Sequence, residues 1–228
     1  MLTGFFISLI VAALAIHYLF VERPRRKKLL VTPALPEPLP LRDALNGLPD
    51  GGYLQPGFTW TQILDNGEVL VGIHPMLVSL VGSPYSLRVI PEGWQVAKGS
   101  PVVRIRQEGR ELRIGSPVSG RIVEVNPNAC MEKGWIRSSA GDSCWIYRME
   151  AQNLFQEMPL WLDGDEARGW ILERYGKIRD HVMEGATDEE VGLALADGGE
   201  MPVGILGQLP DDAWERFQDA FLPSVPKK

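Results

Sequence analysis

Cysteine and histidine are scarce in this chain of 228 residues, which contains two cysteines and three histidines. Cys130 and Cys144 form neither a CxxC motif nor a zinc-binding spacing, and no cluster of carboxylates or thiols accompanies His74 or His181. We therefore predict no metal site and expect both histidines in core or surface roles. The two cysteines are expected to be reduced thiols in a cytoplasmic domain, whereas a disulfide between them would indicate a non-cytoplasmic domain.

The motifs typical of enzymes and of nucleic-acid-binding proteins are also missing. The sequence has no nucleophile paired with a base, no metal-ligand set and no phosphate-binding loop. Its net charge is −6 at pH 7, and it has no basic stripe with interleaved aromatic residues. These absences predict a non-catalytic protein that binds no cofactor and no nucleic acid.

A long apolar run is present at the start of the chain. Residues Leu2–Val21 contain no acidic or basic side chain except His17, and about twenty residues at 1.5 Å per residue can cross a bilayer. A basic cluster follows this run, whereas a secretory signal peptide has its positive charge before the run. By the positive-inside rule, residues 1–22 are expected to be a single-pass anchor in the inner (cytoplasmic) membrane, with the rest of the chain in the cytoplasm. The membrane-proximal basic cluster consists of Arg23, Arg25, Arg26, Lys27 and Lys28.

Residues 23–51 are expected to form a basic and proline-rich linker. Prolines recur at short spacing between Thr32 and Pro40, which favours extended polyproline II geometry and a semi-rigid spacer. A recruitment site for a proline-binding module is the alternative that this pattern leaves open.

Alternation of apolar and polar residues predicts a β-hairpin in the middle of the chain. Val102–Ile105 and Leu112–Ile114 alternate with a period of two, and Gln107–Arg110 supplies a polar turn between them. The segments Pro91–Gly99 and Ser116–Asn126 on either side share a similar pattern of turns and short apolar steps. The repeated pattern predicts a pseudo-symmetric sandwich of short strands.

Several segments resemble, in the same order, the motifs of the glycine cleavage system H-protein family. The closest to that family's consensus is Ser116–Asn126, SPVSGRIVEVN, which is specific to lipoyl- and biotinyl-type domains. The resemblance covers about Gly52–Val182 and implies an α+β, mainly β fold, with residues 52–182 forming a barrel-sandwich hybrid of the lipoyl type. The other matching segments are Pro56–Trp60, Gly67–Gly82, Val89–Gly99 and Cys144–Met149.

The resemblance ends at the residue that carries the family's cofactor. H proteins attach lipoate to a lysine seven residues before the serine of the SPVSG motif, and that position is Gly109 in this chain. Arg110 cannot replace the lysine because its guanidinium stays protonated, and the carboxylate of Glu108 forms no amide with another carboxylate. We interpret Glu108, Gly109 and Arg110 as a degenerate lipoyl tip in which glycine suits a tight turn. Lys98, in the opposite turn, and Lys133 are the alternative acceptors.

Helical patterns follow the sandwich. Apolar residues between Ala167 and Ile178 recur at steps of three and four behind an acidic start, which predicts an amphipathic helix. Residues 183–228 exceed the H-protein-like part and are expected to form a helical extension, with one helix after Thr187 and another near Pro210. One face of the last helix is a candidate partner surface, unless it packs on the chain's own domain. That face comprises Trp214, Phe217 and Phe221.

The sequence therefore favours a non-catalytic, membrane-anchored module of the H-protein type without lipoylation. Its expected role is that of a docking or scaffold subunit in a membrane-associated assembly, with a protein partner that the sequence does not identify. One alternative is an export adaptor similar to membrane fusion proteins, which would have long heptad hairpins between its lipoyl halves and a non-cytoplasmic domain. Another is an atypical lipoyl carrier of the glycine cleavage type, acylated at Lys98.

Overall fold

The computed structural model describes residues 40–82, 86–127, 145–185 and 199–222. All of these residues belong to one compact unit, Ala34–Lys228. The expected membrane anchor, the basic cluster, both cysteines, Lys133 and the helix expected after Thr187 lie outside the described residues. No helix within the described ranges is both long enough and apolar enough to cross a membrane.

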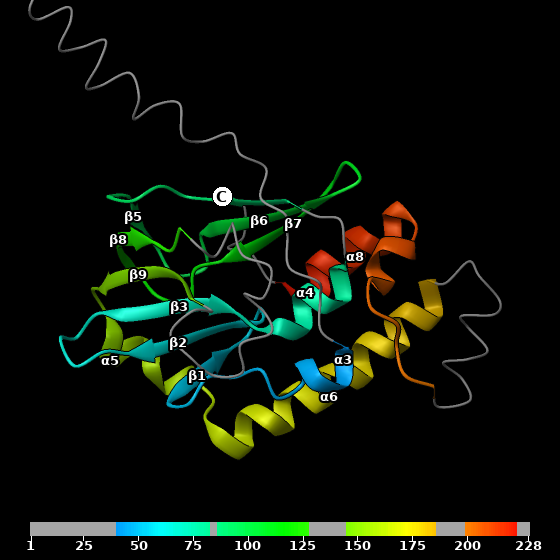
Figure 1. Cartoon of the computed structure of the whole chain (residues 1–228), viewed down its shortest axis with the longest axis horizontal. Coiled ribbons are helices and arrows are strands. Elements are labelled where there is room, and N and C mark those ends of the chain that lie inside the picture. Colours follow the sequence, from blue (N-terminus) through cyan, green and yellow to red (C-terminus); the bar gives the residue numbers. More distant parts are fainter. Residues whose placement is uncertain (1–39, 83–85, 128–144, 186–198, 223–228) are drawn as a thin grey trace, which may run out of the picture. The chain divides into compact units, whose positions relative to one another are not determined.

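Nine strands form two antiparallel sheets in the described residues (Figure 1). The larger sheet has the order β1-β2-β3-β9-β8-β5, and the smaller sheet has the order β4-β6-β7. This arrangement confirms the predicted β-sandwich, and β6 and β7 confirm the predicted hairpin. The strands are β1 Gly52–Gln55, β2 Thr59–Ile63, β3 Val69–Ile73, β4 Ser86–Val89, β5 Gln95–Val96, β6 Pro101–Gln107, β7 Arg110–Gly115, β8 Gly120–Val125 and β9 Trp145–Ala151.

A buried tyrosine connects the two sheets. The hydroxyl of Tyr147, on β9, donates to the carbonyl oxygen of Val102 on β6 at 2.7 Å. The same hydroxyl accepts from the backbone N–H of Ile90, just after β4, at 2.8 Å. Tyr147 lies with Trp60 and Phe58 among the largest fully buried side chains, so these two bonds cross an otherwise apolar core.

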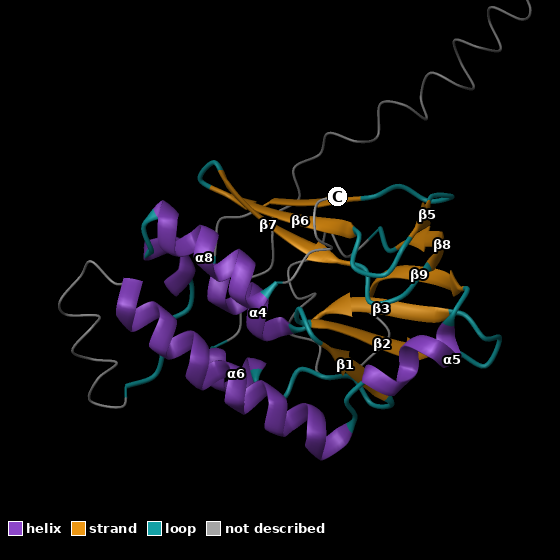
Figure 2. Ribbon diagram, turned by 180° about the vertical axis from the view of Figure 1, so that it is seen from behind, coloured by secondary structure: helices purple, strands orange, loops and turns teal. Residues whose placement is uncertain are grey.

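The larger helices gather beside one end of the strands (Figure 2). In the longest, α6, Ala167, Ile171, Ile178 and Val182 are buried, and their spacing places them on one face, as the sequence predicted. Helix α8 contacts both α6 and strand β7, while α4 contacts the 3-10 turn η3. The helices are α3 Leu41–Ala44, α4 Pro75–Val81, α5 Leu154–Glu157, α6 Gly164–Gly185 and α8 Asp211–Phe221, with 3-10 turns η2 Met158–Leu160 and η3 Ile205–Gln208.

Two glycines allow the C-terminal extension to reach α4. Gly82, which ends α4, has φ +73°, and Gly204, which precedes η3, has φ +79°. The N–H of Gly204 donates to the carbonyl oxygen of Ser79 at 2.8 Å. A Cβ atom on Gly82 would lie 2.3 Å from the Cα of Gly204, so the two backbones approach this closely because Gly82 has no side chain, while the positive φ of Gly204 favours glycine there.

The aromatic face of α8 is buried within the chain, which corrects one expectation from the sequence. Trp214, Phe217 and Phe221 are exposed by only 3%, 0% and 7%. They belong to the same hydrophobic core as the sandwich, and the rings of Phe217 and Phe221 lie 4.9 Å apart. The candidate partner surface is therefore a core contact, because an α8 packed in this way cannot present these rings to another protein.

The connection between the two repeated half-motifs is short. Pro91–Gly99 and Ser116–Asn126 are joined directly by the β6–β7 hairpin, residues 101–115. The long helical hairpins that an export adaptor would have at this point are thus replaced by two paired strands.

Candidate functional site

The tip of the β6–β7 hairpin is a two-residue turn. Gln107 pairs with Arg110 across the hairpin, which leaves Glu108 and Gly109 as the turn residues. Both have positive φ, +50° and +86°, as a type I′ turn requires. A positive φ is uncommon for glutamate but readily adopted by glycine. Gly109 therefore has the role in a tight turn that the sequence predicted. No atom of the described part of the chain lies within 4 Å of the position that a Cβ on Gly109 would occupy, so these residues leave this point of the turn open.

Arg110 attaches the tip to the C-terminal extension. Its guanidinium donates from Nη1 to the carbonyl oxygen of Leu209 at 2.7 Å and from Nη2 to that of Gly207 at 2.8 Å. The same guanidinium lies over the ring of Trp214, 4.5 Å from its centroid. These carbonyls are at the end of η3, where carbonyl groups have no partner within the turn itself. Arg110 therefore satisfies them and holds the extension against the hairpin.

A glutamine of α8 occupies the free edge of β7. The side-chain oxygen Oε1 of Gln218 accepts from the N–H of Arg113 at 2.7 Å, and its Nε2 donates to the carbonyl oxygen of Arg113 at 3.2 Å. Nε2 also donates to the carbonyl oxygen of Leu222 at 2.7 Å. Because β7 is the last strand of its sheet, this amide takes the place of a neighbouring strand at one residue. We call Gly207, Leu209, Trp214 and Gln218, which hold the hairpin, the C-terminal clamp.

A further glutamine supports the hairpin from the side of α4. Gln107, the last residue of β6, donates from Nε2 to the carbonyl oxygen of Val81 at 3.0 Å. Its Oε1 is fully enclosed and has no hydrogen-bond partner among the described residues. The tip is thus fixed by α4 on one side and by the clamp on the other.

Lys98 lies at the opposite end of the hairpin from Gly109. The turn that contains it is bonded to the SPVSG segment, where Gly99 N–H donates to Ser116 O at 2.7 Å and Lys98 N–H donates to Ser119 Oγ at 2.9 Å. Its ammonium group is 3.5 Å from the carbonyl oxygen of Glu157. The structure therefore confirms that Lys98 belongs to the turn opposite the tip.

The two described histidines have packing roles. His74 caps the N-terminus of α4, where its Nδ1 accepts from the N–H of Met76 at 3.3 Å. His181 lies between α6 and α8, with Nε2 3.0 Å from the carbonyl oxygen of Ala213 and its ring beside Phe217 and Phe221. Both positions agree with the core or surface roles expected from the sequence.

Gln218 was not predicted as a functional residue, although the sequence contains a signal for it. Gln218 follows Trp214 by four residues and precedes Phe221 by three, so it falls on the buried face of the helix. A polar residue on such a face indicates a hydrogen-bond partner in the core. Its partner, Arg113, is 105 residues away and could not be identified from the spacing.

Comparison with known proteins matches the sandwich to one family. The family model described as "Glycine cleavage H-protein" matches residues 53–171, which is more than half of the chain. The chain belongs to the glycine cleavage H-protein family. H proteins are non-catalytic lipoyl carriers, and membership therefore confirms the prediction that the chain is not an enzyme.

Individual H proteins resemble the chain over about half of its length. A probable glycine cleavage system H protein of Thermococcus kodakarensis is 28% identical over 114 residues, which cover 50% of this chain and 84% of that protein. Glycine cleavage system H protein 3 of Aquifex aeolicus is 28% identical over 91 residues, covering 40% of this chain and 56% of that protein. The crystal structure of an H protein from Mycobacterium marinum matches with a TM-score of 0.44 and 21% identity, over 54% of this chain and 98% of that one.

Proposed function

We propose that this member of the H-protein family carries no lipoate and acts as a docking or scaffold subunit tethered to a membrane. The observation that carries the proposal is the hairpin tip. The position where family resemblance places the lipoyl lysine is Gly109, in a two-residue turn without an amine. Neither neighbour of Gly109 in the sequence, Glu108 or Arg110, offers an acylatable amine in its place.

The C-terminal clamp gives the proposal a second support. A carrier must present its acceptor residue to a ligase and then move the attached arm between partner sites. In this chain, the arginine beside the turn is bonded to two carbonyl groups of the extension and stacked on Trp214. A tip held on both sides suits a fixed surface better than a mobile arm.

Lipoylation is tested by intact mass. The full-length chain is coexpressed with a lipoate ligase that modifies H proteins, with an H protein as the positive control and Lys98→Arg as a matched variant. We expect the H protein to gain a lipoyl adduct and this chain to gain none. An adduct that disappears in Lys98→Arg would instead establish the carrier alternative and refute the proposal.

Gly109→Lys tests whether the amine alone is missing. Space is available for the side chain, but φ +86° is strained for any residue other than glycine, and Glu108 and Arg110 differ from the family's tip. We expect at most trace lipoylation of Gly109→Lys. Efficient modification of this variant would show that the clamp and the turn do not hinder the ligase.

Membrane attachment is proposed from Leu2–Val21 and the basic cluster that follows it. A reporter that is active only in the periplasm, fused after Lys228, should stay inactive, whereas a cytoplasmic reporter at the same point should be active. The reverse result would place the domain outside the cytoplasm, reverse the proposed orientation and favour the export-adaptor alternative.

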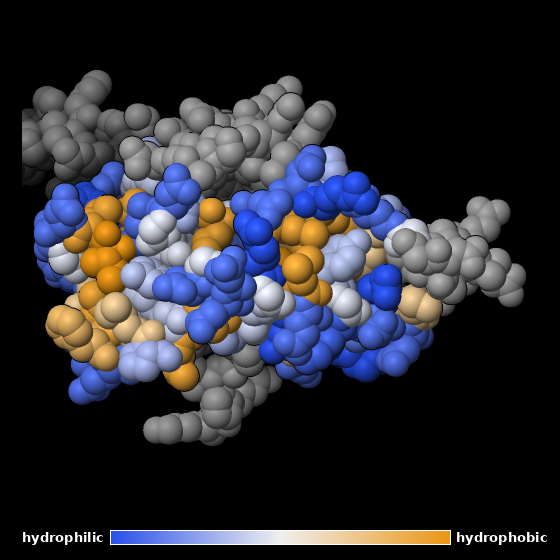
Figure 3. Space-filling model, turned by 90° about the horizontal axis from the view of Figure 1, so that it is seen from below, coloured by the Kyte–Doolittle hydropathy of each residue, from blue (hydrophilic) through white to orange (hydrophobic). Residues whose placement is uncertain are grey.

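Exposed apolar side chains offer a surface for docking. Phe155 on α5 is 90% exposed and Leu160 on η2 is 65% exposed. Figure 3 shows apolar surface gathering at the end of the molecule that carries α5. If a protein partner docks here, Phe155→Ser with Leu160→Ser should abolish its co-purification from detergent-solubilised native membranes, and Leu172→Ser on α6 should not. Equal co-purification with all variants would exclude this surface.

A further inference from the structure

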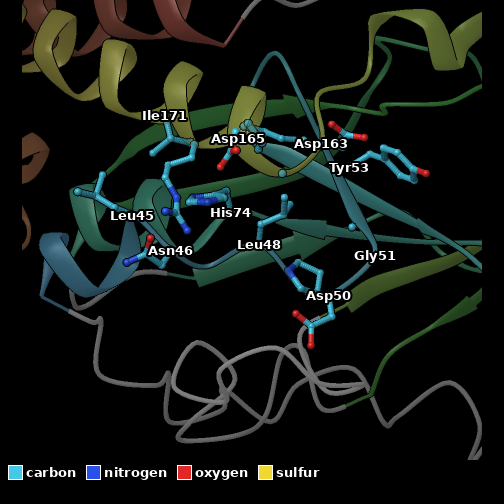
Figure 4. A pocket seen from close by; sticks show the side chains of 16 residues that line it. Leu45, Asn46, Leu48, Asp50, Gly51, Tyr53, His74, Asp163, Asp165 and Ile171 are labelled. Atoms are coloured by element: carbon cyan, nitrogen blue, oxygen red, sulfur yellow. The ribbon is translucent and has the colours of Figure 1, made fainter.

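A separate cavity of about 530 Å³ opens between the loop from α3 to β1 and the first turn of α6. Leu54 and Ile171 contribute to its apolar wall, and none of the hairpin-tip residues lines it. Figure 4 shows its labelled side chains on two walls, with His74 between the residues of α6 and those of the loop. No residue of the C-terminal clamp lines this cavity either.

His74 gives the cavity an unpaired donor. The side chain is 1% exposed and lines the cavity. Because Nδ1 accepts from Met76 N–H, the ring proton is on Nε2, which has no hydrogen-bond partner among the described residues. Burial lowers the pKa of His74 to about 3, so the imidazole is neutral at physiological pH. Capping α4 does not require an imidazole, since the smaller side chains of serine, threonine, aspartate and asparagine also cap helices.

The mouth of the cavity is acidic. Asp50 lies on the loop wall, and Asp163 and Asp165 lie at the start of α6. Arg168 is the one arginine or lysine in the lining that the described residues form. Carboxylates at this end of α6 also favour the helix dipole, so they do not define a site by themselves. The Nε2 donor of His74, on a residue that is 1% exposed and lines the cavity, is the independent sign that the cavity receives a ligand, because buried polar groups normally have partners.

We propose that this cavity binds a primary ammonium group next to a carbonyl, the chemistry shared by free amino acids and the N-terminus of a peptide. The carbonyl oxygen accepts from His74 Nε2, the ammonium group stays among the carboxylates, and an apolar side chain packs on Leu54 and Ile171. A lysine or arginine side chain entering head first would bring its donors against the donor of His74. The ligand therefore enters with its acceptor first and keeps its cation at the mouth.

The experiment measures binding of L-leucinamide to the full-length chain in detergent micelles by saturation-transfer NMR titration. N-acetyl-L-leucinamide keeps the carbonyl and the side chain but lacks the cation, and we expect it to bind at least about tenfold more weakly. L-leucine and leucyl-leucinamide distinguish the two sources: tighter binding of the first favours a free amino acid, and tighter binding of the second favours a peptide. Equal affinity for L-leucinamide and its acetylated form would overturn the proposal.

Matched variants locate the binding. Asp50→Asn and Asp163→Asn should each weaken L-leucinamide binding about threefold or more, while Asp211→Asn, in the first turn of α8, should not change it. His74→Asn keeps a capping side chain but removes the donor, and should weaken binding of both leucinamides. If the mouth variants bind like Asp211→Asn, the cavity is not the site, whatever the stability of His74→Asn.

Discussion

Among single residues, Tyr147 links the two sheets, because its hydroxyl forms hydrogen bonds to the backbone on the other side of the core. Its partners, Ile90 and Val102, belong to the other sheet or its edge. Tyr147→Phe keeps the ring and leaves both backbone groups without this partner, which should lower the free energy of unfolding by about 1–3 kcal/mol. Urea denaturation checks this value. Tyr53→Phe is the control, because no hydrogen bond of its hydroxyl to the described residues occurs; similar losses in both variants would contradict the bridging role.

The buried side chain of His74 should make the free energy of unfolding depend on pH. Its pKa is about 3 in the folded chain, against an ordinary value of 6.5, so below pH 6.5 the unfolded chain binds a proton that the folded chain does not. Above pH 6.5 this proton has no effect on the free energy of unfolding. Between roughly pH 6 and pH 4, the free energy of unfolding falls by up to about 1.4 kcal/mol for each pH unit. Urea denaturation across this range should show a smaller slope for His74→Asn than for the unchanged chain. Parallel slopes would show that His74 is protonated in the folded state.

At the scale of elements, helix α8 protects the edge of β7. Gln218→Ala should lower the free energy of unfolding by about 1–3 kcal/mol, because Arg113 loses the partner of its N–H and carbonyl groups. It should also speed amide hydrogen exchange at Arg113 more than at Val103, inside the sheet. Glu215→Ala, on the exposed face of α8, is the matched control. Unchanged exchange at Arg113 would mean that the amide of Gln218 does not protect the edge.

The elements were largely predictable, and the contacts between them were not. The alternation around Gln107–Arg110 and the steps of three and four in α6 are local patterns, so the hairpin and the helix followed from the sequence. The same reasoning placed Trp214, Phe217 and Phe221 on one face of a helix. It could not decide what covers that face, since an apolar stripe looks the same whether it packs on its own core or on a partner. The contact between Arg110 and the extension could likewise not be predicted, because about one hundred residues separate the partners in the sequence.

At the scale of the whole molecule, the C-terminal extension is part of the core. Phe217→Ala should lower the free energy of unfolding by about 3–5 kcal/mol, because its ring is fully buried. Phe155→Ala, the matched exposed aromatic, should change it by less than about 0.5 kcal/mol. A chain that ends at Gly185 should be less stable than either variant, as measured by thermal unfolding. Full stability of that shortened chain would show that the sandwich folds without its extension.

The clamp also affects the order in which the chain can fold during synthesis. Gln218 is translated 105 residues after Arg113, which takes roughly 5–20 s at about 5–20 residues per second. During that interval the hairpin can form, but the outer edge of β7 has no amide to cover it, and exposed strand edges are sites of aggregation. A nascent chain of this protein is therefore prone to aggregation at this edge until α8 leaves the ribosome. Ribosome-bound chains that stop before α8 should bind chaperones more strongly than those that include it.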